Sequence, residues 1–247
     1  MSYFLAPRAL AEGETAVLEG EEARHLLQSR RIKAGERFAL QDPAGRRFWA
    51  EVVQAGRGSA HVRILAPAPI PPAPGIAVRL WVAAVKDKAA EWIVQKATEL
   101  AVAEVHAFSA THSPLSPQEL SAPRTLERWQ RIAVEACKQC DRQFPPPIAV
   151  WPSLEALLAG RPERGAAWLL DAGGTLPPRP PRAAAAGITV LVGPEGGLTE
   201  MERKTAIAAG FMPVALGPLT LRTETAAIAG CAVALAVGAG ALQTAKA

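Results

Sequence analysis

The feature that most limits how this chain can fold is a dense run of prolines over residues 66–75. Prolines stand at positions 67, 69, 71, 72 and 74 of the 247 residues. Such a segment lacks the backbone N–H groups and the φ freedom that helices and central strands need, so it is extended and semi-rigid. We therefore predict a domain boundary here, with one small domain over residues 1–70 and a larger one over residues 76–247.

The part before the prolines is composed of short apolar or alternating runs separated by turns. Residues 38–40, 48–53 and 60–65 are expected to form strands, with turns rich in Gly and Pro between them. One helical stretch is expected over residues 21–30. Short strands with frequent turns in about 65 residues predict a small β-barrel.

After the prolines, strand-like runs alternate with helical ones. The expected strands are residues 78–85, 104–108, 148–151, 166–170, 188–192 and 212–216. Thr199 and Glu202 have the spacing of a helix capping box, and Gly210 stands where that helix would end. This alternation predicts an α/β domain, with a mostly parallel sheet flanked by helices.

Charge is informative through its distribution rather than its sum. The chain has 27 basic and 23 acidic residues, a net charge of +4 that is too small to indicate nucleic-acid binding by itself. Between residues 24 and 37, however, five residues are basic and only Glu36 is acidic. Such a cluster fits phosphate contacts or an ordinary solvated face, and the charge run alone does not decide between them.

Three cysteines do not make a disulfide framework in a chain of this length. Cys137 and Cys140 have the spacing of half a zinc site, but no second pair or histidine cluster accompanies them, so we expect packing roles and no metal. The start of the chain lacks a secretory pattern, and the apolar run 226–242 is rich in Ala and Gly, which favours a buried helix over a membrane span. A soluble, cytoplasmic protein is expected.

Two loops combine glycines with charged residues, each after an expected strand and before an expected helix. The first, Leu191–Gly197, matches neither the dinucleotide nor the phosphate-loop fingerprint, so it is either a ligand turn of another kind or an ordinary turn. In the second, Leu216–Thr225, Arg222 and Glu224 either cap a helix of low polarity or serve a site. Loops that follow parallel strands converge at one sheet edge, which predicts a shared pocket.

These two loops, read as Val192–Thr199 and Leu216–Ala226, resemble the cofactor-loop motifs of the 16S rRNA uridine N3-methyltransferases, a branch of the SPOUT superfamily. Further similar stretches are Gln95–Leu100, Arg128–Cys140 and, near the start, Arg24–Leu27 with Arg31–Glu36. The similarity runs in order along nearly the whole chain. It implies an N-terminal PUA-like β-barrel, a C-terminal SPOUT domain with a trefoil knot, a homodimer, and S-adenosylmethionine as cofactor.

The resemblance also assigns roles. It implies cofactor binding by Leu191, Gly193, Pro194, Gly196, Gly197, Leu216, Gly217 and Leu221. It implies RNA binding by Arg24, Arg30, Arg31 and Lys33. The substrate would be N3 of one uridine (uridine 1498 in the usual rRNA numbering), in free 16S rRNA or in the small ribosomal subunit.

N3 of uridine carries a proton, so its methylation requires a proton acceptor and stabilisation of the resulting imide charge. Arg222 is our candidate for stabilising that charge or placing the uridine. Either Glu195 or Glu224 would accept the proton or orient Arg222. No metal is needed for this chemistry.

The chain departs from the family pattern at Ala101, where glycine is usual, and at Ser29. Thr111-His112-Ser113 replaces an Arg-Ser step, and Leu219-Thr220 stands where an Arg or Lys is frequent. Three alternatives are a SPOUT enzyme that methylates another group such as a ribose 2′-hydroxyl, a non-catalytic RNA-binding module, and a nucleotide-using metabolic enzyme. The intact cofactor loops disfavour the second, and the missing nucleotide fingerprints disfavour the third.

Overall fold

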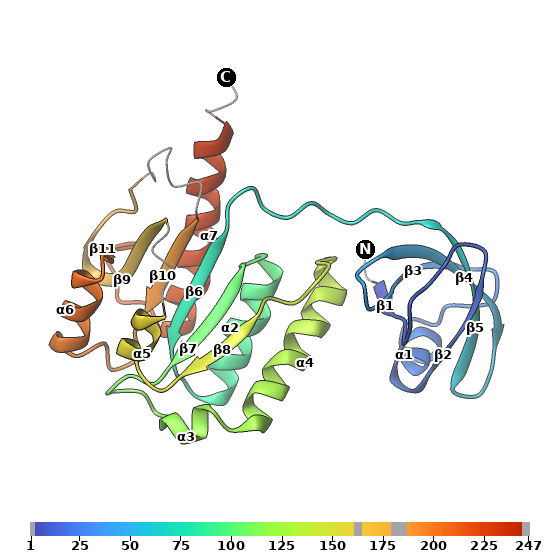
Figure 1. Cartoon of the computed structure of the whole chain (residues 1–247), viewed down its shortest axis with the longest axis horizontal. Helices are drawn as coiled ribbons and strands as arrows, with labels where there is room; N and C mark the ends of the chain where they lie inside the picture. Colours follow the sequence, from blue (N-terminus) through green and yellow to red (C-terminus); the bar gives the residue numbers. More distant parts are fainter. Residues whose placement is uncertain (1–2, 161–164, 179–186, 244–247) are drawn as a thin grey trace. The chain divides into compact units, whose positions relative to one another are not determined.

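The computed structural model describes residues 3–160, 165–178 and 187–243. The chain separates into two compact units (Figure 1). The first contains Met1–Pro72 together with Cys137–Phe144, and the second contains Ala73–Ala136 and Pro145–Ala247. The first unit therefore includes a segment that lies far beyond the proline-rich boundary.

The first unit is built on a five-stranded sheet in the order β1-β3-β4-β5-β2. Its strands are β1 (Tyr3–Leu5), β2 (Thr15–Glu19), β3 (Arg37–Gln41), β4 (Arg47–Ala55) and β5 (Ser59–Pro67). The strands expected near residues 38–40, 48–53 and 60–65 are confirmed as β3, β4 and β5, whereas β1 and β2 were not expected. β1 pairs in parallel with β3, and the remaining pairs are antiparallel. Phe4, Leu18, Leu26, Leu40 and Ile64 lie in the core of this unit.

The helix expected over residues 21–30 needs a correction, because it is regular only at its start. It begins as α1 (Gly20–Arg24) and continues as a wider π-helical turn, η1 (His25–Ser29). The backbone N–H of Arg30 donates to the carbonyl of His25, five residues earlier, at 2.9 Å. This wider turn accompanies a ring contact between His25 and Phe4, whose centroids are 5.2 Å apart.

The segment Cys137–Phe144 contacts the sheet of the first unit through polar and aromatic groups. The buried Arg47 guanidinium forms an ion pair of 3.2 Å with Asp141 and lies 4.0 Å above the Tyr3 ring. The Tyr3 hydroxyl donates to the carbonyl oxygen of Arg142 at 2.8 Å. Since a buried guanidinium is costly unless it is paired, these contacts tie the segment to the sheet.

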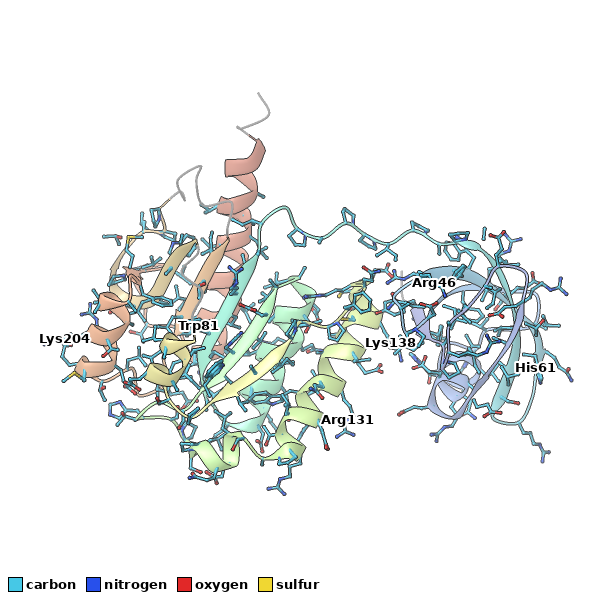
Figure 2. The ribbon with its side chains drawn as sticks, in the orientation of Figure 1. Arg46, His61, Trp81, Arg131, Lys138 and Lys204 are labelled. Atoms are coloured by element: carbon cyan, nitrogen blue, oxygen red, sulfur yellow. The ribbon has the colours of Figure 1, made fainter. Side chains whose placement is uncertain are left out.

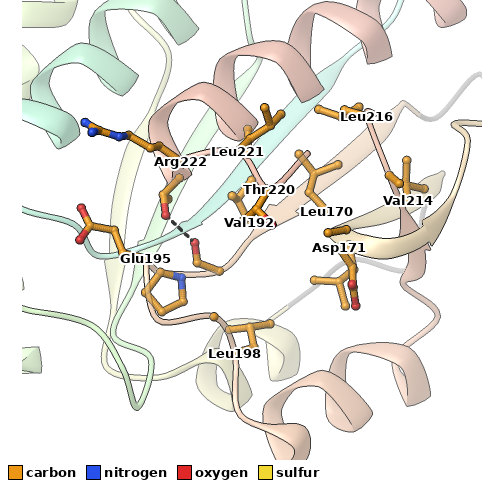
Figure 3. Close-up of a pocket in the computed structure, with 18 of the residues that line it drawn as sticks. Leu170, Asp171, Val192, Glu195, Leu198, Val214, Leu216, Thr220, Leu221 and Arg222 are labelled. Carbon is orange, nitrogen blue, oxygen red and sulfur yellow. Dashed lines mark hydrogen bonds between the residues drawn. The ribbon is translucent and has the colours of Figure 1, made fainter. Parts of the chain in front are cut away.

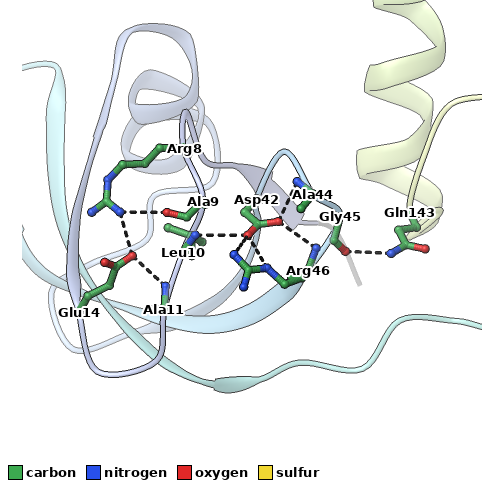
Figure 4. Close-up of polar contacts among 10 residues, drawn as sticks. All are labelled: Arg8, Ala9, Leu10, Ala11, Glu14, Asp42, Ala44, Gly45, Arg46 and Gln143. Carbon is green, nitrogen blue, oxygen red and sulfur yellow. Dashed lines mark hydrogen bonds and ion pairs between the residues drawn. The ribbon is translucent and has the colours of Figure 1, made fainter.

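A second set of contacts involves Gln143 and Lys138. The Gln143 side chain donates to the carbonyl oxygen of Gly45 at 3.0 Å (Figure 4), while its own backbone carbonyl accepts from the Gln41 side chain at 2.7 Å. Lys138 forms an ion pair of 2.6 Å with Glu22. The segment is thus bonded to several strands and turns of the unit.

Cys137, the first residue of this segment, has a packing role. Cys137 is buried against Tyr3, Ala39 and Trp49. Burial raises the pKa of its thiol to about 12, so the thiol stays protonated and unreactive near neutral pH.

The second unit contains a six-stranded sheet in the order β11-β9-β10-β6-β7-β8, with every pair parallel. Its strands are β6 (Val78–Ala83), β7 (Glu104–Phe108), β8 (Ile148–Trp151), β9 (Ala166–Thr175), β10 (Ile188–Val192) and β11 (Met212–Val214). All six expected strands are confirmed, with three changed ends, because β6 stops at Ala83, β11 stops at Val214 and β9 is longer than expected. β9 runs on to Thr175 because Val214 of β11 pairs with it there, after a register shift between Pro213 and Val214. The close approach needs a glycine at 174, where a Cβ would stand 2.5 Å from the Val214 nitrogen.

Helices cover both faces of this sheet (Figure 1). They are α2 (Asp87–Glu99), α3 (Pro117–Leu120), α4 (Pro123–Cys140), α5 (Leu154–Ala159), α6 (Glu200–Ala208) and α7 (Thr223–Gln243). Leu80 belongs to the apolar core that includes residues of α2, α4 and α7. Its neighbour Trp81, labelled in Figure 2, belongs to a second core and packs against Phe211. This alternation along β6 gives the sheet two apolar cores.

Helix α7 is the apolar helix that the sequence predicts to be buried. Ala227, Cys231 and Ala234 are fully buried in it, and Gly230 allows it to lie close to the sheet, since a Cβ there would stand 2.5 Å from Leu170 Cδ1. Burial raises the pKa of the Cys231 thiol to about 12, which rules out a nucleophilic role near neutral pH. No helix among the described residues is long and apolar enough to cross a membrane.

Candidate functional site

A cavity of about 860 Å³ opens at the carboxyl ends of β9, β10 and β11 (Figure 3). Its walls come from the end of β9, from the loop over residues 192–198, and from the loop over residues 214–223. This is the edge where open parallel sheets bind ligands, because the loops that leave neighbouring strands meet there.

The first loop is shaped by a tight turn and a helix cap. The Gly197 N–H donates to the Pro194 carbonyl at 2.8 Å, and Gly197 has a positive φ of 73° that favours glycine. Thr199 and Glu202 then form the expected capping box at the start of α6, in which each side chain bonds to the other residue's N–H. The loop therefore has a defined conformation rather than being a loose connection.

The second loop is joined to the first by one side chain. The Thr223 hydroxyl donates to the Gly193 carbonyl oxygen at 3.2 Å, drawn as the dashed line in Figure 3. Thr223 is buried and begins α7. The two loops thus form one continuous wall, as the sequence predicts from their positions after parallel strands.

The cavity wall exposes backbone at two glycines. A Cβ added to Gly197 or Gly217 would meet no atom within 4 Å, so a ligand can approach the main chain there. Around them stand apolar side chains, including Leu170, Val192 and Leu216. Walls of this kind suit a ligand with a flat, largely apolar part that is recognised through backbone hydrogen bonds.

Charged groups stand on two sides of the cavity. Glu195 and Arg222 lie on one side, and Asp171 lies across the cavity from them (Figure 3). Asp171 accepts a hydrogen bond of 2.7 Å from Arg203, which lowers the pKa of Asp171 and keeps it ionised. Glu195 and Arg222 are both exposed, so they are accessible to a substrate that enters the cavity.

Most of the residues named from the sequence line this cavity. The lining members are Gly193, Pro194, Glu195, Gly197, Leu216, Gly217, Leu221 and Arg222. Leu191 instead lies fully buried within β10, and Gly196 packs against His112 outside the wall. Glu224 lies in the first turn of α7, next to the wall, with one carboxylate oxygen buried and without a hydrogen-bond partner.

Several lining residues were not named as site residues from the sequence, including Asp171, Arg203 and Thr223. Asp171 carried a usable signal, because it is the first charged residue after the apolar run of β9. Arg203 and Thr223 carried none, because their positions depend on how α6 and α7 pack.

The expected RNA-binding residues belong to the first unit. Arg24, Arg30, Arg31 and Lys33 are all exposed there, in α1, after η1 and in the turn that follows. Arg31 has a positive φ of 55°, which marks a sharp change of chain direction inside the cluster. Among the described residues of the whole chain, no group of three His, Cys, Asp or Glu side chains could hold a metal ion.

The protein has two units, with a ligand-sized cavity at the edge of the parallel sheet of the second unit, and family models match both units. Residues 72–235 match the RNA methyltransferase domain, and residues 18–65 match the RNA methyltransferase PUA domain. The chain belongs to this family of RNA methyltransferases. The resemblance seen in the motifs, the PUA-like N-terminal unit and the parallel C-terminal sheet are thereby confirmed. The trefoil knot stays a prediction.

The relatives point to one branch of this family. Ribosomal RNA small subunit methyltransferase E of Mycobacterium bovis is 33% identical over 240 residues, covering 95% of this chain and 88% of the relative. The protein of the same name from Synechocystis is 32% identical, covering 92% and 75%.

Solved structures agree with these sequence relatives. Ribosomal RNA small subunit methyltransferase E from Neisseria gonorrhoeae, bound to S-adenosyl methionine, superposes with a TM-score of 0.83 at 28% identity, covering 94% of this chain and 96% of that one. A methyltransferase from Legionella pneumophila, with a TM-score of 0.81 at 24% identity, shows the same fold.

Proposed function

We propose that this protein transfers a methyl group from S-adenosylmethionine to N3 of a uridine in 16S ribosomal RNA. The observation that carries the proposal is the cavity at the sheet edge, where both glycine-containing loops form one wall beside Arg222 and Glu195. Support comes from the similar Neisseria gonorrhoeae protein, whose structure holds bound S-adenosyl methionine.

The residues present fit such a cofactor. The open main chain at Gly197 and Gly217 would contact its polar edges, and Leu170, Leu216 and Leu221 would pack against its apolar parts. When bound, S-adenosylmethionine supplies a methyl group on a positively charged sulfur, which leaves as a neutral thioether. The protein's main task is then to align the uridine with that methyl group.

Arg222 and Glu195 are proposed to handle the proton and the charge of the uridine. Glu195 is exposed at the cavity wall, on the same side as Arg222, and would accept the N3 proton (Figure 3). Arg222 would stabilise the negative charge that spreads over O2 and O4 of the base. Glu224, in the first turn of α7 beside the wall, is the second candidate for accepting the proton or orienting Arg222.

The exposed cations of the first unit would bind the RNA backbone. Arg24, Arg30, Arg31 and Lys33 cluster on a domain that matches the RNA methyltransferase PUA model. The substrate would be 16S rRNA, free or in the small ribosomal subunit, so the protein would act in the cytoplasm.

We further propose a homodimer. Ala232, Ala236 and Ala239 are exposed at helical spacing on α7, which leaves an apolar strip uncovered in the single chain. Light scattering should then give twice the mass of the chain, and the mass of one chain would contradict the dimer.

The function is tested by incubating the purified protein with S-adenosylmethionine carrying a labelled methyl group and with small-subunit RNA from a strain that lacks this activity. Nuclease mapping and mass spectrometry should find one N3-methyluridine. A methyl group on a ribose 2′-oxygen would contradict the proposed target. Cofactor binding without any transfer would contradict the proposed activity.

A further inference from the structure

We infer that Thr111, His112 and Glu202 are positioning residues that fix the cofactor turn from outside the cavity. The inference rests on the proposed function, because it takes the turn over residues 193–199 as part of the cofactor site. None of these three side chains lines the cavity, so their effect would pass through the turn itself.

The first connection is made by Glu202. Glu202 is only 6% exposed, and both of its carboxylate oxygens accept hydrogen bonds. Oε2 accepts from the Thr199 N–H at 2.7 Å and from its hydroxyl at 2.8 Å, which completes the helix cap. Oε1 accepts from the Thr111 N–H at 2.8 Å and from its hydroxyl at 3.1 Å. A capping box requires only the bond from the Thr199 N–H to Glu202 and the reciprocal bond from the Glu202 N–H to the Thr199 hydroxyl, so the pair from Thr111 is an additional link to a distant loop.

Hydrogen bonding keeps this buried carboxylate ionised. Burial by itself raises the pKa of Glu202, but the bonds donated by Thr111 and Thr199 outweigh it and lower the pKa. Charge-assisted hydrogen bonds of this kind are stronger than neutral ones. The junction between the two loops is therefore firm at neutral pH.

The second connection is made by His112. Its Nδ1 lies 3.0 Å from the Gly197 carbonyl oxygen. Because a carbonyl can only accept, Nδ1 must carry the hydrogen in this contact. The same residue packs closely on the turn, since a Cβ added at Gly196 would stand 3.0 Å from His112 Cβ. The turn is thus bonded at Gly197 and at Thr199 by two side chains that do not line the cavity.

The loop that carries these residues is itself ordered. The Ser113 hydroxyl accepts from the Ala110 N–H at 3.0 Å, and the Ser109 hydroxyl donates to the Leu115 carbonyl at 3.2 Å. The loop after β7 therefore acts as a fixed support. Backbone groups that recognise a ligand must be held within a few tenths of an ångström, so loosening this support should weaken cofactor binding more than it slows methyl transfer.

The test compares Thr111→Val, His112→Ala and Glu202→Gln with the matched control Glu200→Gln. Glu200 lies in the same helical turn but is exposed, and it forms an ion pair of 3.5 Å with Lys204. Calorimetric titration with S-adenosylmethionine should show about tenfold weaker binding in each of the three variants. The control should bind the cofactor as tightly as the wild type. The KM for the cofactor should rise in parallel, while kcat at saturating cofactor stays within about twofold.

Thr111→Ser keeps both donors to Glu202 and should restore wild-type affinity. Unchanged cofactor affinity in Thr111→Val and His112→Ala would overturn the inference, as would a fall in kcat with unchanged affinity. His112 is exposed, so its variant is expected to fold even if Glu202→Gln does not. If the wild-type protein itself fails to bind S-adenosylmethionine, the proposed function fails instead.

Discussion

The Thr223 hydroxyl donates a hydrogen bond of 3.2 Å to the carbonyl oxygen of Gly193. The two residues belong to different loops, and Thr223 is only 4% exposed, so water cannot readily replace the hydroxyl. One side chain therefore sets the relative position of the two halves of the cavity wall.

Replacing Thr223 by valine removes this bond without changing the side chain's shape. The Gly193 carbonyl then loses its donor in a partly buried place, which should cost about 1–3 kcal/mol in the free energy of unfolding. Cofactor affinity should fall as well. Urea unfolding and calorimetric titration measure the two effects, with the exposed Thr225→Val as control. Wild-type values for both quantities would show that the bond does not join the loops.

The substitution Gly217→Ala should weaken cofactor binding without changing the stability of the fold. The added methyl group meets no atom within 4 Å and Gly217 does not have a positive φ, so the melting temperature should stay within about 1–2 °C. The methyl group does, however, occupy the cavity wall, and the Kd for S-adenosylmethionine should rise by about tenfold or more. Unchanged affinity would mean that the ligand does not approach the main chain at this point.

Arg222→Ala tests the proposed charge stabilisation. Loss of the guanidinium should lower kcat by about 10²-fold or more, as for other groups that stabilise developing charge, while the cofactor Kd changes little. Single-turnover methylation measures the first and titration the second. Lys204→Ala, at an exposed position on α6, serves as the control. Near-normal turnover would remove Arg222 from the mechanism.

Acid should weaken the Glu202 junction in a defined pH range. The pKa of Glu202 is below its ordinary value of 4.5 in the folded chain, so the unfolded chain takes up the proton first as the pH falls. The stability that Glu202 contributes is therefore fully present above about pH 4.5 and is lost as the pH falls through the lowered pKa. Urea unfolding of the wild type and of Glu202→Gln should differ at pH 7 and converge in acid. A difference independent of pH would contradict this assignment.

If the first unit binds RNA phosphates, the affinity for RNA should fall as the salt concentration rises. If Arg31 and Lys33 each contact a phosphate, Arg31→Gln and Lys33→Gln should each reduce the slope of log K against log salt by about 0.7–0.9. Filter binding over a range of salt concentrations measures the slope. Arg57→Gln, at an exposed turn of the same unit, should leave it unchanged. Equal slopes in the wild type and all three variants would show that Arg31 and Lys33 do not contact RNA phosphates.

The sequence predicted the parallel sheet well, and residues 104–108, 148–151 and 188–192 are strands with the expected bounds. The clearest case is 188–192, an apolar run that is buried along its whole length, as a strand covered on both faces should be. β1 has only three residues and pairs with β3, far along the chain, so no local pattern could reveal it. The π-helical turn at η1 similarly depends on packing around His25.

The candidate site was predicted in outline and refined by the structure. The convergence of the two loops follows from their positions after parallel strands, which are readable from the sequence. Side-chain directions are not readable in this way, as Leu191 shows by pointing into the apolar core. The pairing of Asp171 with Arg203 depends on how α6 packs beside β9, which is a long-range property. The link from Glu202 to Thr111 joins residues 91 positions apart.

The first unit is assembled from two stretches of chain, and this makes it a poor candidate for modular exchange. A fragment that ends at the prolines would retain Arg47 and Tyr3 but lose Asp141 and the Arg142 carbonyl that they contact. Grafting this barrel onto another enzyme, or inheriting it by recombination, would require Cys137–Phe144 to travel with it. The RNA-binding and catalytic parts are therefore expected to have diverged together rather than to have been shuffled as independent pieces.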